Sequence, residues 1–250
     1  MDIQSLLQTT DHRPWPLPTG PWVMTQIWHN LLFAHWPLPP DVLQPYIPPP
    51  FKLDTFNGQA WLGVVPFRMS NVVVRHLPPV PTTDRFPELN VRTYVDYGGK
   101  PGVLFFSLDA ASTIAVLTAR LWFHLPYFKA TMSLVENDTT IYYDSQRRHP
   151  GSTLARFNGT YHPTAPVSLA QPGSLDKWLT ERYCLYTIDR QGRPLRGEIH
   201  HRPWPLQPAK AALKTNTMAA AAGIHLPDIP PLLHYAHHLE ILIWPLESLV

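Results

Sequence analysis

The sequence has one cysteine, no long apolar run and no leader-like start. Only Cys184 carries a thiol, which excludes an internal disulfide and favours a reducing compartment. Apolar stretches such as residues 239–246 are far too short to cross a bilayer. The first residues lack the basic start and apolar core of a signal peptide. We therefore expect a soluble, cytoplasmic protein with no membrane partner.

Charge and nucleotide-binding motifs are also scarce. Charged residues make up 15% of the chain, and the net charge is +2 with the histidines neutral. The basic residues are scattered, so they form no stripe that would follow a phosphate backbone. No Gly-x-Ser-x-Gly elbow, P-loop or dinucleotide motif is present. We expect no nucleic-acid partner and no cofactor.

The 13 histidines form no recognisable metal-binding motif. His200 and His201 would point to opposite faces of a strand. His234 and His238 would lie about 13–14 Å apart along a strand, too far for adjacent ligands. No HExxH and no cysteine-rich spacing occurs. We predict no metal site.

Proline and tryptophan, by contrast, are abundant, with 30 and 9 residues. A disordered chain rich in proline would contain few aromatic residues, so this combination indicates a globular protein with stiff loops. No internal repeat or low-complexity linker separates two domains. We predict a single domain over residues 1–250.

The pattern of side chains predicts many strands and few helices. A turn at Asn57-Gly58 should join two strands as a hairpin, and Asp109 should cap a helix. Helices are predicted over residues 110–122, 174–182 and 208–223, with a helical turn at 41–46. Strands are predicted over residues 22–35, 52–56, 59–65, 88–96, 103–107, 127–135, 140–144, 153–161, 183–189, 195–201 and 232–244. The fold class is therefore mainly β (α+β), an antiparallel β-barrel or curved sheet with a few flanking helices.

Two of these strands have one apolar and one polar face. The polar faces carry Glu88, Asn90 and Arg92 on one strand and Lys129 and Thr131 on the other. If the apolar faces pack under the helices, the polar faces line the lumen and converge on an enclosed pocket. The alternative is that both polar faces meet water.

Several blocks of sequence resemble the YqjF-like family of uncharacterised proteins. They are Glu88–Val95, Gly102–Asp109, Leu125–Ala130, Trp178–Tyr183, Glu198–Leu206, the opening stretch 22–36 and the terminal strand. The resemblance covers nearly the whole chain. The family supplies no activity that can be carried over.

The order of features is also similar to that of acetoacetate decarboxylase. Glu88, the turn Gly98-Gly99, Asp109, Arg120 and the Pro126–Lys129 stretch follow one another as in that enzyme. The resemblance implies its fold and a site built from these residues. In that enzyme one lysine of a pair forms a Schiff base, and its neighbour lowers the pKa of the reacting amine.

The lysine pair itself is not retained. Tyr127 and Phe128 stand in its place, and Lys129 follows one residue later. A shift of one residue reverses the face of a strand, so Lys129 shares the face of Tyr127. Schiff-base chemistry would then need Arg92 or Arg120 to replace the missing second cation.

Two hypotheses remain open at this stage. The first is an enzyme, a decarboxylase-like lyase acting on a small oxo acid or carboxylate. Its catalytic residues would be Lys129, Glu88 and Arg120, and its substrate-binding residues would be Arg92, Asn90, Tyr94 and Tyr127. The second is a non-catalytic binder of a small apolar ligand, whose walls would include Trp28, Trp61, Phe105 or Trp122. An enclosed Lys129 favours the enzyme and a solvent-facing one favours the binder; whether the chain forms a homo-oligomer stays open.

Overall fold

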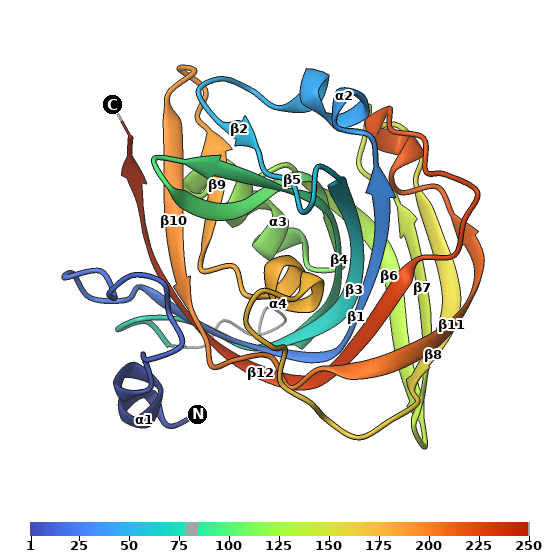
Figure 1. The fold of residues 1–250 in the computed structure, drawn as a ribbon, viewed down its shortest axis with the longest axis horizontal. Helices are drawn as coiled ribbons and strands as arrows, with labels where there is room; N and C mark the ends of the chain where they lie inside the picture. Colours follow the sequence, from blue (N-terminus) through green and yellow to red (C-terminus); the bar gives the residue numbers. More distant parts are fainter. Residues whose placement is uncertain (79–84, 250) are drawn as a thin grey trace.

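The computed structural model describes residues 1–78 and 85–249. Its strands form one continuous sheet (Figure 1), in the order β10-β9-β5-β6-β7-β8-β11-β12-β1-β3-β4-β2. The strands are β1 (Met24–Leu38), β2 (Lys52–Leu53), β3 (Ala60–Val74), β4 (Arg85–Tyr97), β5 (Lys100–Ala110), β6 (Tyr127–Asn137), β7 (Thr140–Arg147), β8 (Arg156–Pro163), β9 (Cys184–Ile188), β10 (Pro194–His200), β11 (Gln207–Asn216) and β12 (Leu232–Ser248). The helices are α1 (Ile3–Gln8), α2 (Pro40–Leu43), α3 (Thr113–Trp122) and α4 (Leu175–Thr180), with 3-10 turns at Gln44–Tyr46 and Ala220–Ala222.

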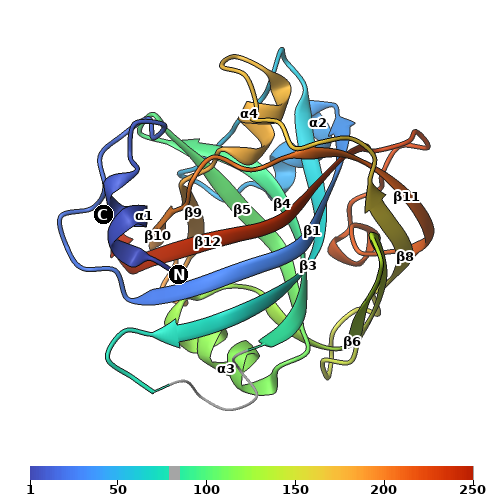
Figure 2. The same ribbon diagram turned by 90° about the horizontal axis from the view of Figure 1, so that it is seen from below.

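Two further pairings close part of this sheet into a ring. β10 also pairs with β12, and β5 also pairs with β4, so β10, β9, β5, β4, β3, β1 and β12 follow one another without a break. The helices α3 and α4 lie at opposite ends of the ring, as the two views show together (Figures 1 and 2). The mainly β fold predicted from the sequence is confirmed.

A second curved layer, formed by β6, β7, β8 and β11, lies beside the ring (Figure 1). β6 leaves β5 after a short parallel pairing, runs antiparallel to β7, and the layer continues through β8 and β11 back to β12. As predicted, β4 and β6 belong to one sheet, and α3 lies between β5 and β6 along the chain.

Two hydrophobic cores result from this arrangement. The first lies inside the ring and includes Phe33, Phe67 and Trp204. The second lies between the ring and the layer of β6, β7, β8 and β11, and it includes Leu89 and Val91. The sequence raised the possibility that the apolar face of β4 packs under the helices. In the structure this face packs against the second layer instead.

The predicted helix over residues 208–223 is wrong. Residues Gln207–Asn216 form β11, in which half-buried and exposed residues alternate, and the strand pairs with β8. Only the short 3-10 turn Ala220–Ala222 follows, and Gly223 ends it with a positive φ of 81°. Pro208 and the alanines favour a helix locally, but the pairing with β8 decides the conformation.

The ends and faces of α3 also differ from prediction. Asp109 lies in β5, and the cap is Ser112, whose hydroxyl accepts the Ala115 amide at 3.3 Å. Ile114, Leu117 and Leu121, the predicted apolar face, are 48%, 55% and 56% exposed. The helix turns Val116 into the first core instead. α3 thus covers one end of the ring, but Val116 is its only buried residue.

The turn at Asn57-Gly58 is present, with φ of 50° and 76°, and Phe56 and Gln59 form a bridge across it. The strands beside it do not form the predicted hairpin, because β2 pairs with β4. Among residues 1–78 and 85–249, no helix is long and apolar enough to cross a membrane.

Candidate functional site

A cavity of about 200 Å³ lies inside the ring, between α3 and the segment that follows α4. Most of its wall is apolar and comes from the first core. Typical lining residues are Trp28, Phe67, Phe86, Phe105, Leu108, Leu125 and Ile199. Of the four wall residues expected from the sequence, Trp28 and Phe105 line the cavity, whereas Trp61 packs elsewhere and Trp122 is 61% exposed.

The polar face of β4 supplies three of the polar groups in this wall. Glu88, Asn90 and Arg92 all line the cavity, and they are 1%, 5% and 6% exposed. The alternation of β4 turns them toward the lumen, while Leu89 and Val91 point into the second core. The three side chains therefore lie in the cavity wall and are buried, as the first of the two alternatives for this polar face expected.

Glu88 is held by two tyrosines. The Tyr127 hydroxyl donates to Glu88 Oε2 at 2.8 Å, and the Tyr143 hydroxyl donates to the Glu88 carbonyl at 2.7 Å. Burial raises the pKa of Glu88 from 4.5 to about 8, with the Tyr127 hydrogen bond acting against this shift and nearby Asp109 adding to it. The carboxyl group is therefore mostly protonated at neutral pH and can donate a proton into the cavity.

Arg92 is a buried cation that forms no ion pair within the described residues. Its Nε has no hydrogen-bond partner, and its Cζ lies 5.2 Å from the Phe33 ring and 5.8 Å from the Tyr94 ring. His35 Nε2 lies 2.7 Å from the Tyr94 hydroxyl. Tyr94 is fully buried and does not line the cavity, so it supports Arg92 from behind.

A second arginine approaches from the segment after α4. Arg182 Nη1 donates to Asp54 at 2.6 Å and Nε donates to the Trp178 carbonyl at 2.6 Å. Its Nη2 is buried and has no partner, and so is Nε1 of Trp204; both residues line the cavity. Arg92, Arg182 and Trp204 thus leave unpaired N–H donors in residues that line one cavity.

Two of the residues predicted as catalytic do not reach the cavity. Lys129 is half-buried, and its ammonium donates to the Thr113 hydroxyl at the start of α3. Arg120 is exposed, and Nη1 donates to the Tyr127 carbonyl at 2.6 Å. The expectation that Lys129 shares the pocket of Glu88 is corrected, because β6 pairs with β5 only as far as Lys129 and then leaves the ring. Thr131, further along β6, is exposed.

Sequence reasoning missed Arg182 and Trp204 as site residues. Arg182 lies in the Trp178–Tyr183 block and Trp204 in the loop after β10, so their proximity to Arg92 depends on long-range packing. The sequence offered only the presence of arginine and tryptophan in those two segments. Such content does not show whether a side chain points toward the cavity.

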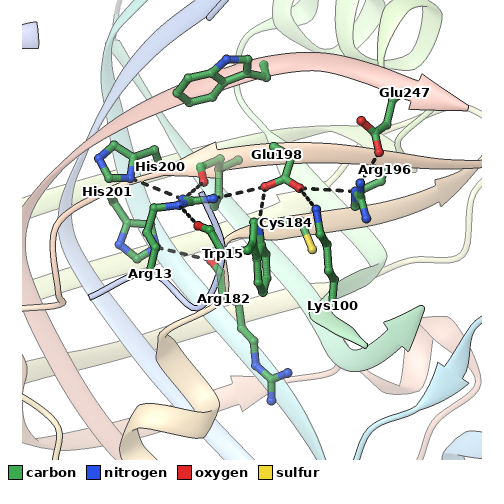
Figure 3. Close-up of polar contacts among 12 residues, drawn as sticks. Arg13, Trp15, Lys100, Arg182, Cys184, Arg196, Glu198, His200, His201 and Glu247 are labelled. Carbon is green, nitrogen blue, oxygen red and sulfur yellow. Dashed lines mark hydrogen bonds and ion pairs between the residues drawn. The ribbon is translucent and has the colours of Figure 1, made fainter. Parts of the chain in front are cut away.

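The outer face of the same wall carries a buried ionic cluster (Figure 3). Glu198, on β10, is 4% exposed and accepts from Arg13 Nη2, Lys100 Nζ and the Trp15 indole at 3.2, 3.2 and 2.8 Å. His12 Nε2 donates to the carbonyl of His201, a residue that lines the cavity. Residues 12–15 therefore fix the outside of the cavity wall and do not enter the cavity.

No group of three His, Cys, Asp or Glu side chains in residues 1–78 and 85–249 could hold a metal ion. Cys184 is buried, and burial raises the pKa of its thiol to about 12. Neither a metal-assisted reaction nor a reactive thiolate is indicated by the residues around this cavity.

Comparison with known proteins places the chain. The model of the DUF2071 family, described as an uncharacterized conserved protein, matches residues 25–240. The chain belongs to the DUF2071 family. This DUF2071 protein is 48% identical to the uncharacterized protein YqjF of Bacillus subtilis (strain 168) over 232 residues, which are 93% of this chain and 95% of that protein. The YqjF-like resemblance is confirmed.

Solved structures with the same fold include acetoacetate decarboxylase of Legionella pneumophila, with a TM-score of 0.60 and 15% identity, covering 99% of this chain and 95% of that chain. An acetoacetate decarboxylase-like enzyme of Sphingomonas wittichii RW1 has a TM-score of 0.61 and 11% identity over 95% and 97%. The enduracididine biosynthesis enzyme MppR complexed with pyruvate has a TM-score of 0.60 and 10% identity over 95% and 93%. At these identities the likeness shows that the DUF2071 protein has the acetoacetate decarboxylase-like fold.

Proposed function

We propose that the cavity binds a small carboxylate with a mostly apolar body, and that Arg92 anchors the carboxylate. The observation that carries this proposal is the buried guanidinium of Arg92, which faces an apolar cavity and has no acidic partner among the described residues. A buried cation without a counter-ion is unfavourable, and a ligand carboxylate would supply the missing charge with bidentate geometry.

The other unpaired donors support the same assignment. Nη2 of Arg182 and Nε1 of Trp204 have no partner in the protein, and both residues line the cavity. A carboxylate has two oxygens with about four acceptor positions, so it can receive several of these N–H groups together. An apolar ligand alone would leave all of them unsatisfied.

The size of the cavity limits the ligand. About 200 Å³ corresponds to roughly seven water molecules at about 30 Å³ each. This volume suits a small acid. MppR, which shares the fold, has been solved with pyruvate bound, and small oxo acids therefore belong in the set of candidates.

A catalytic version of this proposal uses Glu88 as the proton donor. Glu88 lines the cavity on the same strand face as Arg92, and its raised pKa keeps the proton available near neutral pH. Lys129 has no part in it, because its ammonium bonds Thr113 and the residue does not line the cavity.

The second candidate is a non-catalytic binder of a small apolar ligand. The observation that favours it is the lack of lysine and cysteine among the described residues that line the cavity. Covalent catalysis through an amine or a thiol would need such a residue.

Matched ligands distinguish these candidates. Calorimetric titration of short-chain monocarboxylates and their primary amides should show binding of the acids only. Arg92→Gln should weaken acid binding by at least about tenfold, or about 1.4 kcal/mol. Arg120→Gln, which removes an exposed arginine outside the cavity, is the control and should bind as the wild type does.

Equal affinity for acids and amides, unchanged by Arg92→Gln, would support the apolar binder and contradict the carboxylate. Turnover of the bound acid, followed by NMR, then tests catalysis. Loss of turnover in Glu88→Gln with retained binding would support Glu88 as the proton donor.

A further inference from the structure

The unpaired N–H donors of the cavity lie at the end of the ring that α4 covers. They belong to Arg92, Arg182 and Trp204. Arg182 follows α4 directly along the chain, and the Trp204 amide donates to Glu181, the last residue before Arg182, at 2.9 Å. Tyr94, two residues after Arg92 on β4, contacts Trp178 of α4 with ring centroids 4.8 Å apart. One end of the cavity is therefore buried and rich in donors.

The other end of the cavity lies under α3, at the opposite end of the ring (Figures 1 and 2). Phe86 lies six residues before Arg92 on the same face of β4, so their Cα atoms are about 20 Å apart. The Ala111 amide, just before α3, donates to the carbonyl of Pro87 at 3.3 Å. The lining at this end is apolar and includes Met24, Val72, Val74, Leu77, Phe86, Ile114 and Phe123. Leu77 and Ile114 are 53% and 48% exposed, so this apolar end reaches the surface.

We infer that the ligand is an unbranched monocarboxylate of about six to eight carbons, whose carboxylate binds Arg92 and whose alkyl chain runs toward α3. This inference rests on the proposed function, because the carboxylate fixes which end of the ligand lies at the donors. The length follows from the volume of about 200 Å³, since a methylene group is about as large as one of the roughly seven water molecules that this space would hold.

The polar side chains between the two ends offer no partner to a second charge on the ligand. Gln26 accepts the Trp28 indole N–H at 2.9 Å. Glu88 accepts the Tyr127 hydroxyl and is mostly neutral near pH 7, because burial raises its pKa to about 8. The Asn90 amide carries donors beside its acceptor and can meet several kinds of ligand atom. A second carboxylate or an ammonium group on the chain would therefore be buried without a counter-ion.

Two small side chains of α3 leave room for the end of the alkyl chain. Ala115 and Ala119 both line the cavity and lie four residues apart, on one face of the helix. A larger side chain at either position would shorten the cavity from the α3 end and leave the donors around Arg92 untouched. The length of the acid that fits is therefore determined by α3.

The test is a calorimetric titration of the wild-type protein with straight-chain monocarboxylates of four, six and eight carbons and with their primary amides. The affinity of the acids should rise about threefold to fourfold for each added methylene group, because each one is removed from water. Ala119→Leu should weaken binding of the eight-carbon acid at least about tenfold and leave the four-carbon acid unchanged. Leu117→Phe, which adds volume on the exposed face of the same helix, is the control and should bind all three acids as the wild type does.

The outcomes separate this inference from the proposed function. Acids that bind better than their amides, with no gain between four and eight carbons, would overturn the alkyl-chain inference and leave the carboxylate site intact. An equal loss for the four-carbon and eight-carbon acids in Ala119→Leu would overturn the direction of the chain. Equal affinity for acid and amide at every length would overturn the proposed function itself. The wild-type series decides the matter even if Ala119→Leu does not fold.

Discussion

Glu88 contacts both the cavity and the second core, the first through its side chain and the second through its main-chain carbonyl. The side chain faces the cavity and accepts the Tyr127 hydroxyl, while the main-chain carbonyl accepts the hydroxyl of Tyr143 from the second core. The carboxyl group has been removed from water without gaining a cation, which is why its proton is retained.

The stability of the protein should therefore depend on pH through Glu88. The folded state keeps a proton up to a pKa of about 8, whereas the unfolded state releases it near 4.5. The contribution is complete below about pH 4.5 and is lost as the pH rises toward 8, by at most about 1.4 kcal/mol per pH unit. In urea unfolding between about pH 5 and pH 8, the free energy of unfolding should fall more steeply for the wild type than for Glu88→Gln.

The buried histidines titrate in both proteins, so the difference between the two curves isolates Glu88. Parallel curves for the wild type and Glu88→Gln would show that the carboxyl is ionised in the folded state.

At the residue scale, sequence alternation predicted the site only where the strand is regular. β4 is paired on both sides and keeps its period of two, so Glu88, Asn90 and Arg92 share the face that the sequence assigned to them. The prediction for Lys129 was wrong because alternation gives the face of a strand but not the residue at which the strand separates from its neighbour. Arg182 could not be predicted, because it reaches the cavity only through the packing of the segment after α4.

At the scale of the elements, β5 and β9 approach each other closely at one glycine. Gly102 lies where the two strands meet, and a Cβ at that position would be 2.7 Å from Cys184 Sγ and 2.8 Å from the Cys184 carbonyl oxygen. The parallel pairing of β5 with β9, which helps to close the ring, therefore requires a residue without a side chain at position 102.

Gly102→Ala should destabilise the protein by about 1–3 kcal/mol, because β9 must move away to admit the methyl group. Gly20→Ala is the matched control, since a Cβ there meets nothing within 4 Å, and its effect should stay within about 0.5 kcal/mol. Urea unfolding midpoints measure both. Equal midpoints for Gly102→Ala and the wild type would show that β9 adapts freely.

Element types were predictable where hydrophobic alternation was strong, and they failed where alanine dominates. In β11, Ala209, Ala211 and Leu213 are half-buried and the intervening residues are exposed, a strand pattern made of residues that favour helices. The information that fixes this segment lies in its partner β8, more than forty residues away in the sequence.

At the scale of the molecule, the two cores share one wall. β1, β3 and β4 have the cavity on one side and the second core on the other, so neither core can lose its packing alone. We therefore expect the chain to unfold as one cooperative unit, which is also what a single domain over residues 1–250 requires.

Differential scanning calorimetry should show one transition whose calorimetric and van't Hoff enthalpies agree. The enthalpy ratio is the decisive quantity, because two overlapping transitions would raise the calorimetric value above the van't Hoff value. Two resolved peaks would mean that the ring and the layer of β6, β7, β8 and β11 behave as separate domains.

We expect the few core contacts of α3 to set how long the proposed ligand stays in the cavity. The helix has ten residues, only Val116 of them is buried, and yet Ile114, Ala115 and Ala119 form part of the cavity wall. Lifting such a helix costs far less than unfolding the ring, because local opening depends on the few contacts that are broken. Exchange of the proposed ligand should therefore be a local event. Its residence time should follow the stability of α3, while the melting temperature should follow that of the ring.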